Sequence, residues 1–401
     1  MRVVAAPFVL TGAAGPLLRD GAVALESDRL IAVGPRAEVE ARCGPAEPLD
    51  AVLLPALANA HLHLELSHLA GRVPGGDGLA PWILRLVSAR AASASEEVER
   101  GLGAGVESLR AGGVAAVGEV SNTLASLPVL SWGGFSGTIF HEVFGFSAER
   151  AEAALAAARA ARELAPTGPP GLAIALSPHA VYSTHPGTVE RLLRAGPASI
   201  HLAEDPAERA FCARFEGPLA DIAVKLGAAP GEVPPARSAV AAAAPHLGAR
   251  SLVVHAVDLD GEDLAALRAS GSTVVLCPRS NLHIGGRLPD LPRLLEAGLP
   301  LAVGTDSLAS SPSLGPLGEL TCLRRAFPEV PADRLLALAW NGAAVGAPAV
   351  GRLVPGAAPG LLLAPLGGER PRDPAAWLLD AFGAEERPFS WLARHRPEVR
   401  A

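Results

Sequence analysis

The sequence predicts an α/β protein: a parallel eight-stranded barrel of the (β/α)8 type, with a small sheet made from both chain ends. From residue 53 onward, short apolar runs alternate with segments of helical period rich in Ala, Leu, Arg and Glu. Eight such runs occur, and after residue 350 short strands and turns return. Because strands that alternate with helices form parallel sheets, and eight of them can close on themselves, these observations favour a barrel.

The chain ends differ in pattern from the middle. Short strands separated by glycine-containing turns are expected at residues 3–10, 21–25 and 30–33. After Val350, the pairs Pro355-Gly356 and Pro359-Gly360 again mark bends between short apolar stretches. We expect the two ends to pair with each other.

The barrel strands are expected at Ala51–Leu54, Val114–Val117, Gly137–Phe140, Leu172–Leu176, Ser199–Leu202, Leu252–Val254, Thr273–Leu276 and Leu301–Val303. Helices are expected at Glu96–Arg110, Ala148–Leu164, Thr188–Arg194, Asp263–Ala269 and Leu291–Ala297. The predicted domains are therefore residues 1–54 as the first part of the small domain, 55–347 as the barrel, and 348–401 as its second part and a tail.

Composition excludes several classes of function. The 401 residues contain 34 Lys and Arg against 41 Asp and Glu, a net charge of −7, with no basic tract for nucleic acid to bind. No apolar run approaches the roughly 20 residues of a membrane span, and no signal peptide is visible, so we expect a cytoplasmic protein. The four cysteines lie far apart and are expected to be reduced. The sequence leaves open whether the protein forms a homo-oligomer.

Two histidines follow the first apolar run. His61 and His63 are two residues apart, and on an extended chain such side chains leave the same face, which suits two ligands of one metal. Two core or surface histidines at this spacing also arise by chance, so the pair needs support from the other strands.

That support comes from three later strand ends. His201 ends the fifth predicted strand with Glu204 three residues on, His255 ends the sixth, and Asp306 follows the eighth. The carboxyl ends of barrel strands meet at one rim, so these side chains are expected to converge on a metal site with a position open for water. Each also has a plainer interpretation: a core histidine, a helix N-cap or a solvated carboxylate.

These residues together resemble the amidohydrolase superfamily, in its branch of cytosine deaminases and chlorohydrolases. The resemblance lies in the segment Pro55–His63, the His201-x-x-Glu204 pair, His255 and the Gly304–Ser307 turn. It implies a distorted (β/α)8 barrel with a small β-sandwich domain from both termini. It also implies one divalent metal, Zn²⁺ with Fe²⁺ as the alternative, bound by His61, His63, His201 and Asp306.

The resemblance assigns proton transfer to Glu204, His255 and Asp306. Some relatives bridge two metals with a carboxylated lysine, but the only lysine here, Lys225, ends no strand, so a mononuclear site is expected. A glutamate that protonates a ring nitrogen favours deamination of an amidine-like ring, because an amide carbonyl offers no such nitrogen. The expected substrate is a small molecule.

Further motifs, Ser177-Pro-His179 and Cys277-Pro-Arg279-Ser-Asn281 among them, resemble the aminodeoxyfutalosine deaminases of the futalosine route to menaquinone. The predicted substrate contacts are Arg279 for a carboxylate, His179 and Ser310 for ribose hydroxyls, and Trp82 as a lid over the base. Alternatively, Arg279 forms a salt bridge with a neighbour and Trp82 is a core anchor.

Three other functions stay open. One is a deaminase of S-adenosylhomocysteine or adenosine, and another is a chlorohydrolase or amide hydrolase of the same branch. The third is a non-catalytic scaffold, because a fold does not fix a function. The roles of Glu65, His68, Glu119 and Glu142 are left unassigned.

Overall fold

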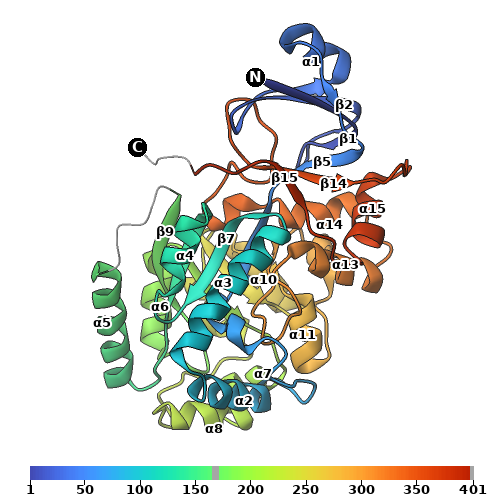
Figure 1. Cartoon of the computed structure of the whole chain (residues 1–401). Coiled ribbons are helices and arrows are strands. Elements are labelled where there is room, and N and C mark those ends of the chain that lie inside the picture. The colour runs from blue at the N-terminus through green and yellow to red at the C-terminus, as the bar shows by residue number, and fades with distance from the viewer. Residues whose placement is uncertain (165–170, 398–401) are drawn as a thin grey trace.

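The computed structural model describes residues 1–164 and 171–397, in which a small sheet from the chain ends lies against one end of a larger α/β body (Figure 1). This confirms the predicted fold class. Residues 398–401, the last of the predicted tail, lie outside the described residues. The proposed domain boundaries stay a prediction.

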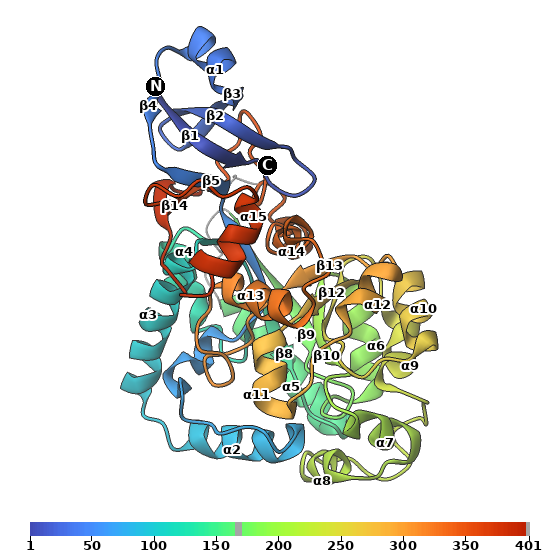
Figure 2. The ribbon, with the colours of Figure 1, turned by 90° about the vertical axis from the view of Figure 1, so that its right-hand side faces the viewer.

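The terminal sheet joins both chain ends. Its strand order is β15-β14-β5-β1-β2-β3, with β4 on β1. The strands are β1 (Arg2–Leu10), β2 (Leu17–Glu26), β3 (Arg29–Pro35), β4 (Glu47–Pro48), β5 (Ala51–Pro55), β14 (Leu361–Pro365) and β15 (Ser390–Ala393). In Figures 1 and 2, the red C-terminal strands lie beside the blue N-terminal ones. The two chain ends pair as expected, through the antiparallel contact of β5 with β14.

One strand assignment was wrong. Ala51–Leu54 was expected to open the barrel, but it forms β5 of the terminal sheet, where it pairs with β1 and β14. The first barrel strand is β6 (Leu57–Leu62), which a single residue, Ala56, separates from the end of β5. Both strands are entirely buried, so the apolar pattern runs through the boundary between them without a break.

The barrel consists of two parallel four-stranded sheets with orders β6-β7-β8-β9 and β10-β11-β12-β13. The remaining strands are β7 (Val114–Ser121), β8 (Ser136–Val143), β9 (Leu172–Pro178), β10 (Ala198–Leu202), β11 (Ser251–His255), β12 (Thr273–Leu276) and β13 (Leu301–Val303). Single parallel bridges, Leu62 with Asp306 and Ala180 with His201, join the two sheets at both seams. The ring of eight is thus connected all the way round.

Helices surround these strands, and each of the five predicted helices is present. The α-helices are α1 (Arg36–Cys43), α2 (Leu79–Ala91), α3 (Ser95–Ala111), α4 (Ser126–Trp132), α5 (Ala148–Leu164), α6 (Pro186–Ala195), α7 (Ala207–Arg214), α8 (Pro218–Lys225), α9 (Ala239–Ala243), α10 (Gly261–Ser270), α11 (Pro278–Gly285), α12 (Leu291–Glu296), α13 (Pro316–Ala326), α14 (Ala332–Ala339) and α15 (Pro374–Trp377). Short turns of 3-10 helix occur at Leu64–Leu69, Ala244–His246 and Gly342–Val345, and a π-helical turn at Leu378–Phe382. In the described part of the chain, no helix has the length and apolar character needed to cross a membrane.

The carboxyl ends of the barrel strands face away from the terminal sheet. Helices α2, α7 and α8 lie at that far end in both views (Figures 1 and 2). The loops that follow the strands therefore meet between these helices and the barrel, which is where barrel proteins place their sites.

Candidate active site

Three imidazoles and one carboxylate converge at the carboxyl ends of the barrel strands. The ligand atoms of His61, His63 and His201 all lie within 4.8 Å of one another. His63 Nε2 is 3.2 Å from His201 Nε2, and Asp306 Oδ1 lies 3.9 Å from His61 Nε2 and 3.6 Å from His63 Nε2. Residues from both halves of the barrel thus meet at one point.

The donor set fits a divalent metal. His61 is completely buried, and neither of its ring nitrogens has a hydrogen-bond partner among the described residues. A buried polar atom without a partner is costly, and an imidazole nitrogen that binds a cation avoids that cost. Three imidazoles with one carboxylate are ligands that Zn²⁺ and Fe²⁺ accept.

Asp306 is held by its own shell of hydroxyls. Ser280 Oγ and Ser310 Oγ donate to Oδ2 at 2.6 and 3.0 Å, which leaves Oδ1 facing the imidazoles. The backbone of Asp306 has a φ of 57°, a left-handed conformation that costs a non-glycine residue energy and persists at functional sites. Burial raises the pKa of Asp306, but the neighbouring His63 and His255 outweigh this effect. The pKa of Asp306 therefore lies below its ordinary value, and the carboxyl is ionised at neutral pH.

The seam between β6 and β13 is fixed by Asn59. Its Nδ2 donates to Thr305 Oγ1 at 2.8 Å and to the Leu314 carbonyl at 3.2 Å, and its Oδ1 accepts from the Thr305 N–H at 3.2 Å. The Thr305 and Asp306 N–H groups both donate to the His61 carbonyl. One buried amide therefore ties the strand that bears His61 to the strand end that bears Asp306.

His201 is oriented from the opposite side. Its Nδ1 lies 3.0 Å from the His179 carbonyl and 3.7 Å from Glu142 Oε1, so Nε2 faces the other imidazoles. Glu142, which the sequence left without a partner, also accepts from Asn122 Nδ2 at 2.8 Å. A carboxylate behind a ligating histidine is the usual outer shell of a metal site.

Glu204 and His255 form a second group beside the imidazoles. Glu204 Oε2 lies 3.5 Å from His255 Nε2, and both side chains are less than one-tenth exposed. Burial, followed by the charge of Asp306, raises the pKa of Glu204 well above its ordinary value, which favours the protonated acid. Burial lowers the pKa of His255 to about 3, so this imidazole is neutral. Asn281 Nδ2 donates to its Nδ1 at 3.0 Å, which leaves the proton on Nε2.

Buried carboxylates hold the loops around the site, and the sequence did not reveal this role. Glu65 accepts from the N–H groups of Asn122, Thr123 and Ala125, at 3.2 Å each, so it supports the loop after β7. Glu119 accepts from the Leu64 N–H. Backbone donors cannot be read from side-chain spacing, and no signal in the sequence marked these acids.

Two predicted substrate contacts have other partners. The Arg279 guanidinium donates to Glu319 at 2.7 Å, to Ser313 and to Glu386, so it forms the salt bridge that the sequence left open as the alternative. The buried Ser310 hydroxyl donates to Asp306. Both substrate contacts stay predictions.

The other two substrate predictions stay predictions. Trp82 lies on α2, buried in the main hydrophobic core, with an indole N–H that has no partner within the described ranges. His179 Nδ1 lies 2.5 Å from Ser183 Oγ, and burial lowers the pKa of this imidazole to about 4.

Comparison with known proteins agrees with this arrangement. The sequence profile of the amidohydrolase family matches residues 52–366, and the chain belongs to that family. It is a hydrolytic deaminase by class, which sets the scaffold alternative aside, and the family is metal-dependent.

Two curated relatives and one solved structure illustrate the similarity. The 5-methylthioadenosine/S-adenosylhomocysteine deaminase of Nitratidesulfovibrio vulgaris is 30% identical over 376 residues, covering 88% of this chain and 81% of the relative. The aminodeoxyfutalosine deaminase of Deinococcus radiodurans is 32% identical over 321 residues, covering 74% and 73%. The Helicobacter pylori aminofutalosine deaminase in complex with methylthio-coformycin superimposes with a TM-score of 0.81 at 21% identity, covering 97% and 98%.

Proposed function

We propose that this protein deaminates an adenine-containing nucleoside, and that its substrate is 6-amino-6-deoxyfutalosine, converted to futalosine and ammonia. The observation behind the reaction type is the buried Glu204–His255 pair, set beside three imidazoles and an ionised carboxylate. The substrate rests on the similarity to the Deinococcus and Helicobacter enzymes described above.

Glu204, Asp306 and His255 have different roles in moving protons during the reaction. Glu204, whose pKa is raised by burial, donates a proton to a ring nitrogen of the base, which makes the adjacent amino-bearing carbon electrophilic. Asp306 accepts a proton from the attacking water, and His255 donates a hydrogen bond from Nε2 to the incoming oxygen. Water adds to the carbon, the carbon–nitrogen bond breaks, and the amino group leaves as ammonia.

His61, His63, His201 and Asp306 would hold the metal, with Zn²⁺ favoured by the nitrogen-rich ligand set. When bound, a divalent metal supplies a Lewis acid that makes water nucleophilic near neutral pH.

A second candidate substrate has support of its own. The Nitratidesulfovibrio relative is named for 5-methylthioadenosine and S-adenosylhomocysteine, and its alignment covers more of this chain than that of the Deinococcus enzyme. Because Arg279 is engaged by Glu319 and Glu386, it gives no argument for a carboxylate on the substrate tail.

The test is ammonia release by zinc-loaded protein from aminodeoxyfutalosine, methylthioadenosine, S-adenosylhomocysteine and adenosine, with the blue shift of the purine absorbance as a second readout. We expect the highest kcat/KM with aminodeoxyfutalosine. Glu204→Gln should lose at least about 100-fold in kcat at unchanged metal content, since general acid catalysis contributes that much. A higher kcat/KM with methylthioadenosine or S-adenosylhomocysteine would select the second candidate, and no ammonia from any of the four would refute the proposal.

A further inference from the structure

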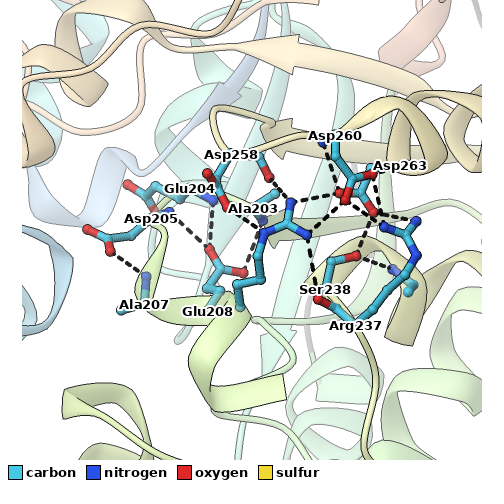
Figure 3. A network of polar contacts seen from close by, with 12 residues as sticks. Ala203, Glu204, Asp205, Ala207, Glu208, Arg237, Ser238, Asp258, Asp260 and Asp263 are labelled. Atoms are coloured by element: carbon cyan, nitrogen blue, oxygen red, sulfur yellow. Dashed lines mark hydrogen bonds and ion pairs between the residues drawn. The ribbon is translucent and has the colours of Figure 1, made fainter. Parts of the chain in front are cut away.

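Glu208 is a buried carboxylate that faces the loop bearing Glu204. It lies in the first turn of α7 and is 1% exposed. Its oxygens accept from three consecutive backbone N–H groups: Oε2 from Ala203 at 3.0 Å, and Oε1 from Glu204 at 2.6 Å and from Asp205 at 3.3 Å (Figure 3). The backbone on which the catalytic acid stands is thus held by one side chain.

This loop needs such support because Ala203 is strained. Its φ of 54° is in the left-handed region, which costs an alanine about 1 kcal/mol or more relative to the ordinary conformations. That conformation turns the chain away from β10 and presents the three N–H groups to Glu208. Without an acceptor there, the loop would lose three buried hydrogen bonds and relax.

The loop after β11 binds the carbonyl group of Ala203. The Ala203 carbonyl accepts from the N–H groups of Val257 and Asp258, both at 2.8 Å. Arg209, the residue after Glu208, donates to Asp258 at 2.9 Å and to the fully buried Asp263 at 2.9 Å. The ends of β10 and β11, which bear Glu204 and His255, are therefore joined through Ala203.

Capping of its own helix accounts for only one of the three hydrogen bonds of Glu208. Asp205 Oδ1 accepts from the Ala207 N–H at 2.8 Å, and Glu208 completes this capping box by accepting from the Asp205 N–H, whereas its bonds to the Ala203 and Glu204 N–H groups lie outside the cap. Glu208 also forms no ion pair with an arginine, a lysine or a histidine in the described ranges. Burial raises the pKa of Glu208 to about 7, so this charge is expensive where it stands, and its hydrogen bonds all go to the Glu204 loop.

We propose that Glu208 is a positioning residue for the reaction: by binding the N–H groups of residues 203–205, it fixes Glu204 within reach of the base and of His255. This inference rests on the proposed role of Glu204 as the catalytic acid. Glu208 itself touches neither substrate nor metal in this assignment, so its effect must act through Glu204.

A double-mutant cycle tests this dependence. The variants are Glu204→Gln, Glu208→Gln and the double variant, each assayed with the best nucleoside substrate, together with metal content and melting temperature. Gln at 208 keeps one acceptor oxygen but turns the NH2 group of its amide, a donor, towards a backbone N–H, so part of the three-bond contact is lost. We expect Glu208→Gln to lower kcat about 10- to 100-fold with KM within about threefold and full metal content.

In the Glu204→Gln background, Glu208→Gln should change the residual rate less than about twofold, because the group that it positions is already gone. Equal losses in both backgrounds, or no loss in the wild-type background, would overturn the proposal. An active Glu204→Gln variant would instead refute the catalytic role of Glu204, whatever Glu208→Gln does.

Two further variants serve as a control and as a substitute in the double-mutant cycle. Glu319→Gln is the matched control: it also places an amide at a fully buried glutamate, but one bonded to Arg279 and Ser311, so its effect should be the same in both Glu204 backgrounds. Glu208→Asp keeps the charge and shortens the reach, and it replaces Glu208→Gln in the cycle if that variant does not fold. The same coupling to Glu204 is expected of it, and an additive loss would count against the proposal.

Discussion

Replacing Asn59 with leucine should weaken both the fold and the metal centre. The side chain is completely buried and joins β6 to the end of β13 through two donated hydrogen bonds, 2.8 and 3.2 Å, and an accepted one of 3.2 Å. Leucine has the same number of side-chain heavy atoms as asparagine, branched at the same carbon, so the change removes hydrogen bonds without opening a cavity. With the Leu314 carbonyl left without this donor, the expected loss is about 2 to 4 kcal/mol of unfolding free energy.

At about 2.1 cal/mol/K of unfolding entropy per residue, a chain of 401 residues loses roughly 1.2 °C of melting temperature per kcal/mol, so the shift is about 2 to 5 °C. Because His61 and Asp306 meet across this seam, zinc affinity should fall by about 10-fold or more, as for other outer-shell changes. The assays are urea unfolding of the metal-free protein and a competitive zinc titration.

The matched control is Asn341→Leu. Asn341 Nδ2 donates to the Leu301 carbonyl at 3.0 Å, at the start of β13 rather than at its metal-bearing end. This variant should lose stability but keep its zinc affinity. If Asn59→Leu loses less than about 1 °C, or if both variants lose zinc affinity equally, the account of the seam is refuted.

Three other outcomes are expected. Removal of the metal by a chelator should abolish deamination and lower the melting temperature, because a buried His61 nitrogen then has no partner. Added zinc should restore the activity and the melting temperature, and full activity after verified metal removal would contradict the proposed metal site. In the metal-free protein, His179 and His255 contribute stability that is lost as the pH falls from about 6.5 towards 4: burial lowers their pKa values to about 4 and about 3, so the unfolded chain takes up these protons first. The raised pKa values of Glu204 and Glu208 act in the opposite direction, so the measurement compares wild type with His179→Gln; between pH 7.5 and 5.5 the wild type should lose more stability than the variant, by about 1.4 kcal/mol per pH unit below 6.5, and equal losses would contradict this. Arg279→Met should cost about 3 kcal/mol by leaving Glu319 buried and unpaired, with KM unchanged; a large rise in KM at full stability would support Arg279 as a substrate contact.

The convergence of the site residues could be predicted because it follows from topology. The carboxyl ends of parallel strands share one rim, so His61, His201 and His255 had to approach one another once their strands were assigned to one barrel. The structure places the ligand atoms of His61, His63 and His201 within 4.8 Å of one another. That they bind a metal stays a prediction, supported by the chemistry of the donors.

The boundary between β5 and β6 could not be predicted for a physical reason. Residues 51–58 are buried on both sides of the boundary, in the terminal sheet before Pro55 and in the barrel after it. Hydropathy reports burial, not the partner strand, so a continuous apolar run hides a change of sheet. The pairing of β5 with β1 and with β14, the latter more than 300 residues away, separates the two strands.

The sequence left the partner of Arg279 open and did not reveal that of Glu208, for related reasons. An arginine beside a strand end is equally suited to a substrate carboxylate and to a buried glutamate, and Glu319 lies 40 residues further along the chain. Glu208 has backbone N–H groups as partners, and every residue except proline has one. Which N–H groups point inward depends on the left-handed Ala203, which is a property of the folded loop.

The predicted metal ligands lie at both seams of the barrel, and a metal bound there would link metal binding to the stability of the whole fold. His61 and Asp306 meet where β6 approaches β13, and His201 forms the bridge that joins β10 to the segment after β9. Among the residues that the structure describes, each seam has a single bridge, whereas the strands within each half are paired over several residues. A cation bound by all three residues therefore joins the two halves at their weakest connections. At a zinc concentration of about 1,000 times Kd, binding to the folded state alone adds about 4 kcal/mol of stability. Separation of the halves requires release of the ion, so this stabilisation protects the closed barrel and not merely the loops at its rim.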